Sequence, residues 1–467
     1  EADLNMIGEE TLVRQILYSK RYVKEKLGFE TRVGWEPDTF GHIWTLPQVF
    51  KKAGVDYYYF MRCGRGYPMF WWEGPDGSRL LAFNSVYNNT VTPRNIVDTA
   101  RLFHEKYGLK TSMFVYGVGN HGGGATIEDI NSALKMREKP AMPNVVFSST
   151  HWFFNEVVSE NPELPVVRDE LNFTFDGCYT THADIKRYNR LCERYLVDAE
   201  KLSAVSGCSA REKLKEAWEK TLFNQFHDIL DGSAFHEAYS YSGRLAEEAL
   251  AAAKKVLEQS IREIASRIGF SQEGLAIIVF NTLAWDRKDV ARVKIPMEMV
   301  PRNPVVRDVY GKQHPARIDD GELVFIAEVP SLGYSTYYLV EGSGSEHTPL
   351  DGEQMVLENE FFKVEVDRDS GAIRSIYDKK TGRFVTKAFR HEATRPEFSN
   401  LFQVLYEAPH GMSAWIIGPI TRVKNLLTGA EVELVRKGPV MSKIKTSRKY
   451  RNSIIMQEIL LYAGVRR

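Results

Sequence analysis

The first third of the chain alternates between strand-like and helix-like patterns of hydrophobic positions. Short apolar runs, such as "VDYYYF" and "TSMFVYG", predict strands, and "MFWWEGPDGSRLLAFNS" is typical of a hairpin that turns at Gly-Pro-Asp-Gly. Apolar residues at steps of three and four predict helices over residues 9–27, 45–53, 93–107 and 126–137. Because strands that alternate with helices favour a parallel sheet, open or closed into a barrel, we expect an α/β domain over residues 1–180.

The pattern changes twice in the rest of the chain. Three long amphipathic stretches with short connectors predict a three-helix bundle over residues 181–268. Strand patterns then predict a small β domain over residues 269–345 and the start of a large β-sandwich over residues 346–467. The last strand pattern, "RNSIIMQEILLYAGVRR", has no closing element, so we interpret the chain as a fragment. The expected fold class is multidomain: α/β, then α, then β.

Composition excludes several classes of function. With 467 residues the chain is too long for one ordinary core. Lys plus Arg and Asp plus Glu both number 61, so no basic surplus indicates nucleic acid or an anionic membrane surface. No apolar run has the length of a membrane span. The four scattered cysteines are typical of reduced thiols, which predicts a cytoplasmic protein.

The first candidate for chemistry is Asp38, in the stretch "GWEPDTFGH". It follows a predicted strand that ends at Trp35, and it precedes the predicted helix that begins at Thr45. In α/β folds, catalytic groups lie at such carboxyl ends of strands. An Asp at this position also caps helices, so the two interpretations remain open from these residues alone.

A second candidate lies in "EKLKEAWEKTLFNQFHDILDGS", which is predicted as one continuous helix with an apolar stripe. Asn224, His227 and Asp228 would share a face because they are spaced by three and four residues. A histidine near a helix end is commonly a core residue or one stabilised by the helix dipole. A His beside an Asp could instead bind a metal ion and a substrate hydroxyl.

Two further stretches follow predicted strands. "FVYGVGNHGGGAT" is rich in glycine but lacks the Gly-Lys-Ser/Thr ending of a phosphate loop. Its glycines either allow a ligand to approach the backbone or simply turn the chain. His121 would lie near Asp38 if both residues follow parallel strands. Arg62, in "YFMRCG", is either an exposed surface residue without a functional role or the partner of an active-site carboxylate.

Together these stretches resemble a known family. "GWEPDTFGHIWTLPQ", "YFMRCG", "GVGNHGGGAT", "CYTTHADIKRYNR" and "NQFHDILDGS" are similar, in order and spacing, to the zinc-dependent α-mannosidases of glycoside hydrolase family 38, the bacterial members above all. "FKVEVDRDSGAIRSIYDKKTGR" resembles the start of that family's large C-terminal sandwich. The resemblance covers essentially the whole chain. It implies a seven-stranded α/β barrel, of which the first strand is missing here.

The resemblance also implies roles for individual residues. Asp38 would be both the nucleophile and a zinc ligand, and His227 would be a second zinc ligand. Asp228 would hydrogen-bond the mannose. Arg62 follows Asp38 at the spacing of the family's arginine that holds the nucleophile, and Tyr87 in "FNSVYNNT" resembles a pocket-lining tyrosine.

This chain departs from the family pattern in two ways. The His-x-Asp pair that would complete the zinc site does not precede the first predicted helix, so two of the four expected Zn²⁺ ligands are absent and the chain looks truncated at both ends. The family's proton donor is a carboxylate in the glycine-rich stretch, where this chain has Asn120 and His121. Asn cannot donate a catalytic proton and His can, so His121 is the predicted acid/base.

The function predicted from the resemblance is a retaining, exo-acting α-mannosidase that removes terminal mannose from oligosaccharides or mannosides. Retention needs a carboxylate nucleophile about 5–5.5 Å from a proton donor. Zinc gripping O2 and O3 of the sugar would act as a template. The alternatives are a metal-dependent polysaccharide deacetylase and a catalytically incomplete sugar-binding fragment. A mannose-containing oligosaccharide is the expected partner, the resemblance allows a homo-oligomer, and neither nucleic acid nor membrane is expected.

Overall fold

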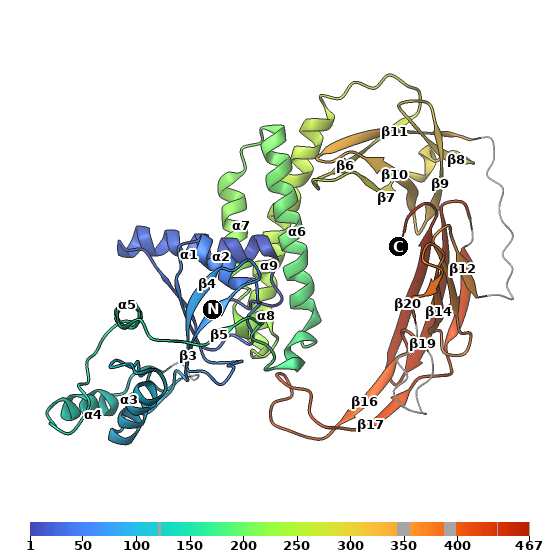
Figure 1. Cartoon of the computed structure of the whole chain (residues 1–467). Helices are drawn as coiled ribbons and strands as arrows, with labels where there is room; N and C mark the ends of the chain where they lie inside the picture. The colour runs from blue at the N-terminus through green and yellow to red at the C-terminus, as the bar shows by residue number, and fades with distance from the viewer. Residues whose placement is uncertain (120–122, 343–354, 387–397, 437, 467) are drawn as a thin grey trace. The chain divides into compact units, whose positions relative to one another are not determined.

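The computed structural model describes residues 1–119, 123–342, 355–386, 398–436 and 438–466 (Figure 1). The chain forms two compact units. The first comprises Glu1–Gln259 together with His410–Ile417, and the second comprises Ser260–Pro409 together with Gly418–Arg467. None of the helices in the described part combines the length and the apolar character that crossing a bilayer requires. The predicted division into four domains stays a prediction.

A mixed five-stranded sheet lies in the first unit, with the strand order β1-β2-β4-β3-β5. Strands β1, β2 and β4 are parallel, while β3 and β4 form the predicted antiparallel hairpin. The strands are β1 (Val33–Glu36), β2 (Tyr57–Phe60), β3 (Met69–Glu73), β4 (Arg79–Asn84) and β5 (Val166–Val167). Since parallel strands end at one edge of a sheet, the segments that follow β1, β2 and β4 meet there.

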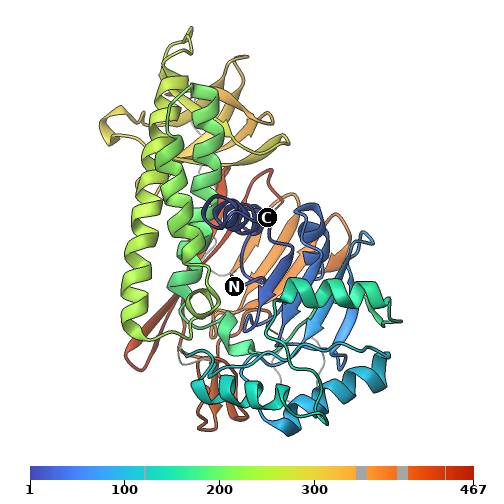
Figure 2. The same ribbon diagram turned by 90° about the vertical axis from the view of Figure 1, so that its left-hand side faces the viewer.

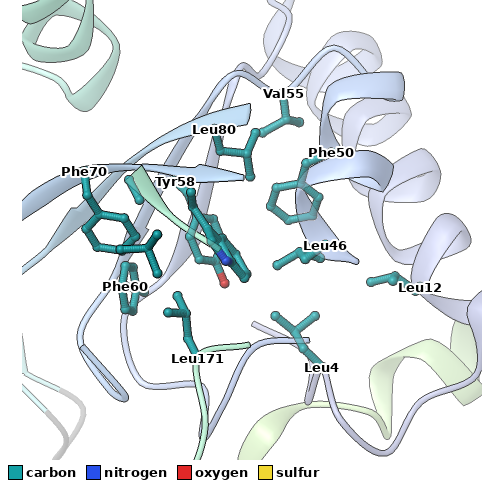
Figure 3. Packing of buried hydrophobic residues seen from close by; sticks show 13 residues of the cluster. Leu4, Leu12, Leu46, Phe50, Val55, Tyr58, Phe60, Phe70, Leu80 and Leu171 are labelled. Carbon is teal, nitrogen blue, oxygen red and sulfur yellow. The ribbon is translucent and has the colours of Figure 1, made fainter. Parts of the chain in front are cut away.

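Both faces of this sheet are buried. Successive residues of a strand point to opposite sides, so one strand contributes side chains to the packing on both faces. On β2, Tyr58 and Phe60 belong to the cluster shown in Figure 3, together with Leu46 and Phe50. Tyr57 and Tyr59 face the other way and pack in a second cluster with residues of α3 (Pro93–Tyr107) and α5 (Thr150–Glu160). The sheet is therefore fixed from both sides, which holds its edge rigid.

The helices of this region have the caps that their sequences predict. Thr92 and Ser149 accept backbone N–H groups at the starts of α3 and α5, and Thr126 and Asp129 form a capping box at the start of α4. Asp129 therefore has a structural role. The helices near the sheet are α1 (Glu9–Leu27), α2 (Leu46–Lys52), α3, α4 (Ile127–Arg137) and α5, followed by the 3₁₀ turn η1 (Asp176–Tyr179).

The predicted strand over "TSMFVYG" is wrong. Residues 111–117 are only partly buried, and they make a single isolated bridge, between Asn89 and Tyr116. Tyr116 packs instead against a small cluster that contains Ala133 and Met136 of α4. Met113 and Val115 of this segment pack against the cluster that contains Tyr57 and Tyr59 of β2, so the segment lies against the sheet without joining it, and in the described residues that sheet has five strands. A seven-stranded barrel is not confirmed.

The rest of the first unit is helical, as expected. One hydrophobic cluster contains residues of three long helices that run alongside one another in Figures 1 and 2. Trp218, which is fully buried, is its largest side chain. The helices are α6 (Ala183–Ser206), α7 (Arg211–Phe223), α8 (His227–Leu230) and α9 (His236–Ala265), of which α6, α7 and α9 share the cluster.

The helix predicted through "NQFHDIL" is interrupted. α7 ends at Phe223, Phe226 is extended (φ −52°, ψ 140°), and the short α8 begins at His227. The cause is a long-range backbone pairing, because Asp3 N donates to Gln225 O at 2.8 Å and Ala2 bridges Phe226. The helical face predicted for Asn224, His227 and Asp228 therefore does not form.

The second unit is built of antiparallel sheets, in agreement with the β patterns. Its first sheet has the order β6-β11-β8-β9-β10-β7, and the others are β12-β13-β14-β15, β16-β17 and β18-β19-β20. The buried Lys443 of β19 lies 2.9 Å from the carboxylates of both Asp319 and Asp320, which joins β19 to the end of β9. The strands are β6 (Leu275–Asn281), β7 (Arg287–Lys294), β8 (Pro304–Asp308), β9 (Gln313–Asp319), β10 (Glu322–Val329), β11 (Gly333–Glu341), β12 (Val356–Glu358), β13 (Phe362–Val366), β14 (Ile373–Asp378), β15 (Arg383–Phe384), β16 (Gln403–Glu407), β17 (Ile420–Asn425), β18 (Glu431–Arg436), β19 (Met441–Tyr450) and β20 (Ser453–Tyr462), with a 3₁₀ turn η2 at Met297–Met299.

Candidate active site

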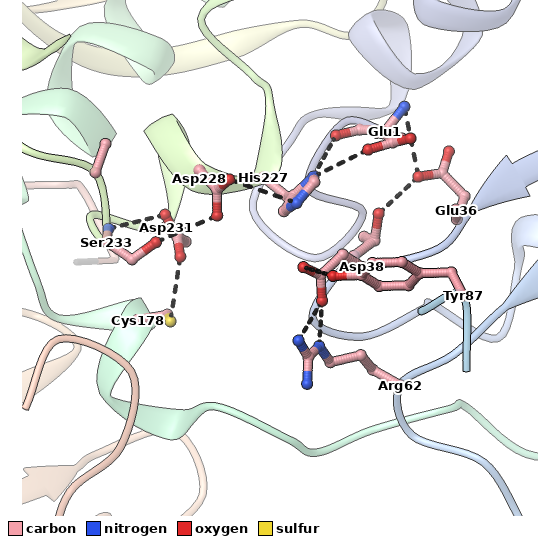
Figure 4. Close-up of polar contacts among 12 residues, drawn as sticks. Glu1, Glu36, Asp38, Arg62, Tyr87, Cys178, His227, Asp228, Asp231 and Ser233 are labelled. Carbon is pink, nitrogen blue, oxygen red and sulfur yellow. Dashed lines mark hydrogen bonds and ion pairs between the residues drawn. The ribbon is translucent and has the colours of Figure 1, made fainter. Parts of the chain in front are cut away.

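Three predicted site residues meet at the carboxyl edge of the sheet (Figure 4). Asp38, Arg62 and Tyr87 follow β1, β2 and β4, respectively, by two or three residues. Arg62 Nε donates to Asp38 Oδ1 at 2.5 Å, and a second guanidinium nitrogen makes an ion pair with the same oxygen. The Tyr87 hydroxyl donates to Asp38 Oδ2 at 2.9 Å. Each carboxylate oxygen thus has its own donor, and a positive charge lies beside one of them.

Tyr87 is held as a neutral donor at this edge. Burial, and secondarily its hydrogen bond to Asp38, raise the pKa of Tyr87 to about 12. A phenol with such a pKa keeps its proton at neutral pH, because ionisation would place a second negative charge beside the carboxylate. The hydroxyl therefore keeps its proton for the Asp38 oxygen.

Aromatic rings surround Arg62 and connect it to the helical region. The guanidinium carbon lies 4.9 Å from the ring centre of Phe175 and 5.7 Å from that of Phe40. The Phe40 ring also lies edge-on to His227, with 5.4 Å between the ring centres. Cation–π contacts of this kind favour the charged guanidinium and fix its plane. Phe40 thus contacts both Arg62 and His227. Sequence reasoning missed it, although Phe40 stands only two residues after Asp38.

His227 and Asp228 begin the short helix α8. The His227 backbone nitrogen and Nδ1 both lie 3.1 Å from the carbonyl oxygen of Glu1, and the ring is almost fully buried. Because a carbonyl can only accept, Nδ1 carries a proton and Nε2 is left to face Asp228, whose Oδ2 lies 3.8 Å away. The Asp228 side chain is 49% exposed, so its carboxylate can receive a ligand from solvent.

The described residues do not assemble a complete metal centre. Within them, no three His, Cys, Asp or Glu side chains converge in a way that could hold an ion. Asp38 and His227 are the two predicted ligands in this part of the chain, whereas protein zinc sites use three or four protein ligands. His121, the predicted acid/base, lies outside the described residues.

Comparison with known proteins identifies the family of this chain. The model of the glycosyl hydrolases family 38 N-terminal domain matches residues 1–177, that of the alpha mannosidase middle domain matches residues 174–264, and that of the family 38 C-terminal domain matches residues 357–467. These matches define the class of protein as a glycoside hydrolase. More specifically, the chain belongs to glycoside hydrolase family 38, the α-mannosidase family.

Individual relatives agree with this assignment. The chain is 26% identical to human alpha-mannosidase 2C1 over 439 residues, which is 89% of this chain and 39% of that protein. It is 30% identical to alpha-mannosidase G of Dictyostelium discoideum over 279 residues, which is 56% of this chain and 26% of that protein. The crystal structure of an alpha-mannosidase from Enterococcus faecalis V583 has a TM-score of 0.76 at 18% identity, covering 99% of this chain and 63% of that chain. The last comparison shows a shared fold.

Proposed function

We propose that this protein is a retaining, exo-acting α-mannosidase that hydrolyses terminal α-linked mannose from oligosaccharides or mannosides. The observation that carries the proposal is the Asp38 carboxylate, which receives hydrogen bonds from Arg62 and Tyr87 at the carboxyl edge of the sheet. Membership of family 38 and the relatives named as α-mannosidases support the choice of sugar.

In the proposed reaction, Asp38 is the nucleophile. One of its oxygens forms a bond to the anomeric carbon, while the bond from that carbon to the leaving oxygen breaks and the acid/base protonates that oxygen. Water then attacks the same carbon, gives up a proton to the base and releases Asp38, so the configuration is retained. Arg62 and Tyr87 hold the carboxylate so that one oxygen lies in line for attack. His121 is the proposed acid/base.

The remaining roles concern sugar binding. Asp228 is proposed to accept hydrogen bonds from sugar hydroxyls, since its carboxylate is half exposed beside the buried His227. Arg62 and Tyr87 are proposed to contact the same sugar as Asp228. Asp38 and His227 are proposed as two ligands of a zinc ion, whose full set requires donors beyond the described residues. When bound, zinc would orient the O2 and O3 hydroxyls of mannose as a template.

Trapping the covalent intermediate tests this proposal. The protein would be incubated with a fluorinated α-mannosyl fluoride, which forms a glycosyl-enzyme quickly and releases it slowly, and then digested for peptide mass spectrometry. We expect one mannosyl adduct on the peptide that contains Asp38, and none in the variant Asp38→Asn. Hydrolysis that first yields the inverted sugar would contradict the retaining mechanism. Acetate release from an acetylated polysaccharide without glycosidic cleavage would favour the deacetylase alternative.

A further inference from the structure

A loop from late in the sequence packs against the segment before α6. Residues 410–417, which connect β16 to β17, belong to the first unit. The carbonyl of Trp415 accepts the backbone N–H of Gly177 at 2.9 Å, and the Thr181 hydroxyl, which donates to Gly177 O at 2.9 Å, also lies 3.2 Å from Ala414 O. The backbone nitrogen of Ile417 donates to Asp176 Oδ1 at 3.0 Å. Two hydrogen bonds and the contact of the Thr181 hydroxyl therefore fix this loop to η1 and the residues after it.

The same segment contacts the turn that follows α8. Cys178 Sγ lies 3.8 Å from the Trp415 carbonyl and 3.5 Å from Oδ2 of the fully buried Asp231. Lys186 of α6 donates to the carbonyl of Asp231 at 2.9 Å and also to the carbonyl of Thr181. The thiol and the ammonium group thus join the residues before α6 to the end of α8.

The residues that follow α8 also form hydrogen bonds with Asp228 (Figure 4). Asp231 Oδ1 accepts the backbone N–H of Ser233 at 3.0 Å, and Ser233 Oγ lies 3.5 Å from Asp228 Oδ1. The carbonyl of Asp228 accepts from Ala234 N at 3.1 Å and from the Tyr239 hydroxyl at 3.3 Å. The side chain and the main chain of Asp228 are therefore both placed by this turn.

We propose that the loop of residues 410–417 is a positioning element for Asp228, acting through Cys178 and Asp231. The proposal rests on the sugar-binding role of Asp228 given above. Among the residues that the structure describes, the loop's hydrogen bonds to the segment before α6 do not include Asp38. It sets where the Asp228 carboxylate stands, and so tunes the affinity for the sugar.

Close backbone packing makes this connection stiff. A Cβ atom at Gly177 would lie 3.0 Å from backbone atoms of both Trp415 and Ile416, and one at Gly232 would lie 2.8 Å from the carbonyl oxygen of Thr181. Because backbone cannot move aside as a flexible side chain can, a displacement at one contact is passed to the next. Gly232 also has φ +95°, which other residues rarely adopt.

A wedge at Gly177 tests the proposal on the whole chain. Gly177→Ala pushes the loop away without touching Asp228, and Gly243→Ala is the matched control because its Cβ would meet open space in α9. The readout is backbone hydrogen exchange by mass spectrometry. In Gly177→Ala we expect exchange over residues 227–234 to rise about tenfold, together with exchange over residues 410–417, while the control stays unchanged. Faster exchange in the loop with unchanged exchange over 227–234 would overturn the proposal.

A milder variant covers the case in which the wedge loosens the whole unit. If Gly177→Ala also raises exchange throughout α6 and α9, Asp176→Ala, which removes the acceptor of the Ile417 N–H, decides by the same criterion. For either variant, assayed with an aryl α-mannoside, we expect KM to be about fivefold higher than in the parent and kcat to stay within about twofold, since only sugar binding is weakened. Failure of the parent to hydrolyse the mannoside would refute the proposed function, and the exchange result would still decide the coupling.

Discussion

Two carboxylates of the first unit have opposite surroundings. Asp38 stands at the edge of a rigid sheet, with the charged donor Arg62 on one oxygen and the neutral donor Tyr87 on the other. Asp231 is fully buried among helices and turns, and its oxygens receive a backbone N–H and a thiol. The Asp38 side chain is 16% exposed and has a cation beside it, whereas Asp231 is fully buried and burial raises its pKa towards the neutral form. A carboxylate's partners and burial therefore decide its role more than its sequence neighbours do.

The largest effect is expected from removing the negative charge of Asp38 at the sheet edge. Asp38→Asn keeps the shape but cannot attack the anomeric carbon, so we expect kcat/KM for an aryl α-mannoside to fall by about 10⁴-fold or more. Asp56→Asn is the control, since Asp56 precedes β2 at the opposite edge and pairs with Arg32. If Asp38→Asn retains a tenth of the parent activity, Asp38 is not the nucleophile.

The cationic partner is expected to have the next largest effect. Arg62→Met keeps the length of the side chain but leaves Asp38 Oδ1 without its charged donor, and we expect kcat/KM to fall by about 10²- to 10³-fold. Arg65→Met is the matched control because Arg65 bonds the carbonyl of Glu170 away from Asp38. Steady-state kinetics of both variants measure the difference, and equal losses would remove the special role of Arg62.

The burial of Asp231 is expected to make the free energy of unfolding depend on pH. Burial raises the pKa of Asp231 to about 6, above its ordinary value of 3.8. The folded protein therefore binds the Asp231 proton more tightly than the unfolded chain does, and this stabilisation is present below pH 4 and lost as pH rises through 6. Between pH 4 and pH 7 we expect the parent to lose about 2 kcal/mol of unfolding free energy relative to Asp231→Asn. Urea denaturation at the two pH values measures this, and parallel curves would contradict it.

The smallest effect is expected for the neutral donor at the sheet edge. Tyr87→Phe removes one uncharged hydrogen bond to Asp38, worth about 1 kcal/mol, so kcat/KM should fall about fivefold. Tyr59→Phe is the control, because that hydroxyl donates to the Ser85 carbonyl instead. A loss as large as that of Arg62→Met would mean that Tyr87 does more than hold the carboxylate.

The sequence predicted the sheet edge and the long helices well, but it missed the break in the helix at Phe226. Asp38, Arg62 and Tyr87 each follow a strand by two or three residues, and strand patterns are local, so their meeting point follows from parallel pairing. The break at Phe226 depends on residues 1–3, more than two hundred positions away, and the apolar spacing there favours a continuous helix. Local periodicity contains no information about such distant backbone pairing.

The site residues also divide into those that local sequence patterns predict and those that depend on distant residues. The charged pair at Asp38 could be found because each residue carries a recognisable motif. The Asp231 turn could not, since "LDGS" is typical of any turn and its partners Cys178 and Trp415 lie far away in the chain. The close packing at Gly177 could not be predicted from the sequence either, because the atoms that a Cβ would contact there belong to residues 415 and 416.

The loop of residues 410–417 also constrains the order in which the protein can form during synthesis. The first unit contains Glu1–Gln259, yet it lacks this loop until the chain has grown past Ile417. At a ribosomal rate of 5–20 residues per second, that delay is roughly ten to thirty seconds after Gln259 is added. During this interval the Gly177 N–H and the Asp176 carboxylate lack their partners in the loop, and the intervening β-strands emerge first. The contacts between the loop and the segment before α6 can therefore form only after most of the second unit has been synthesised.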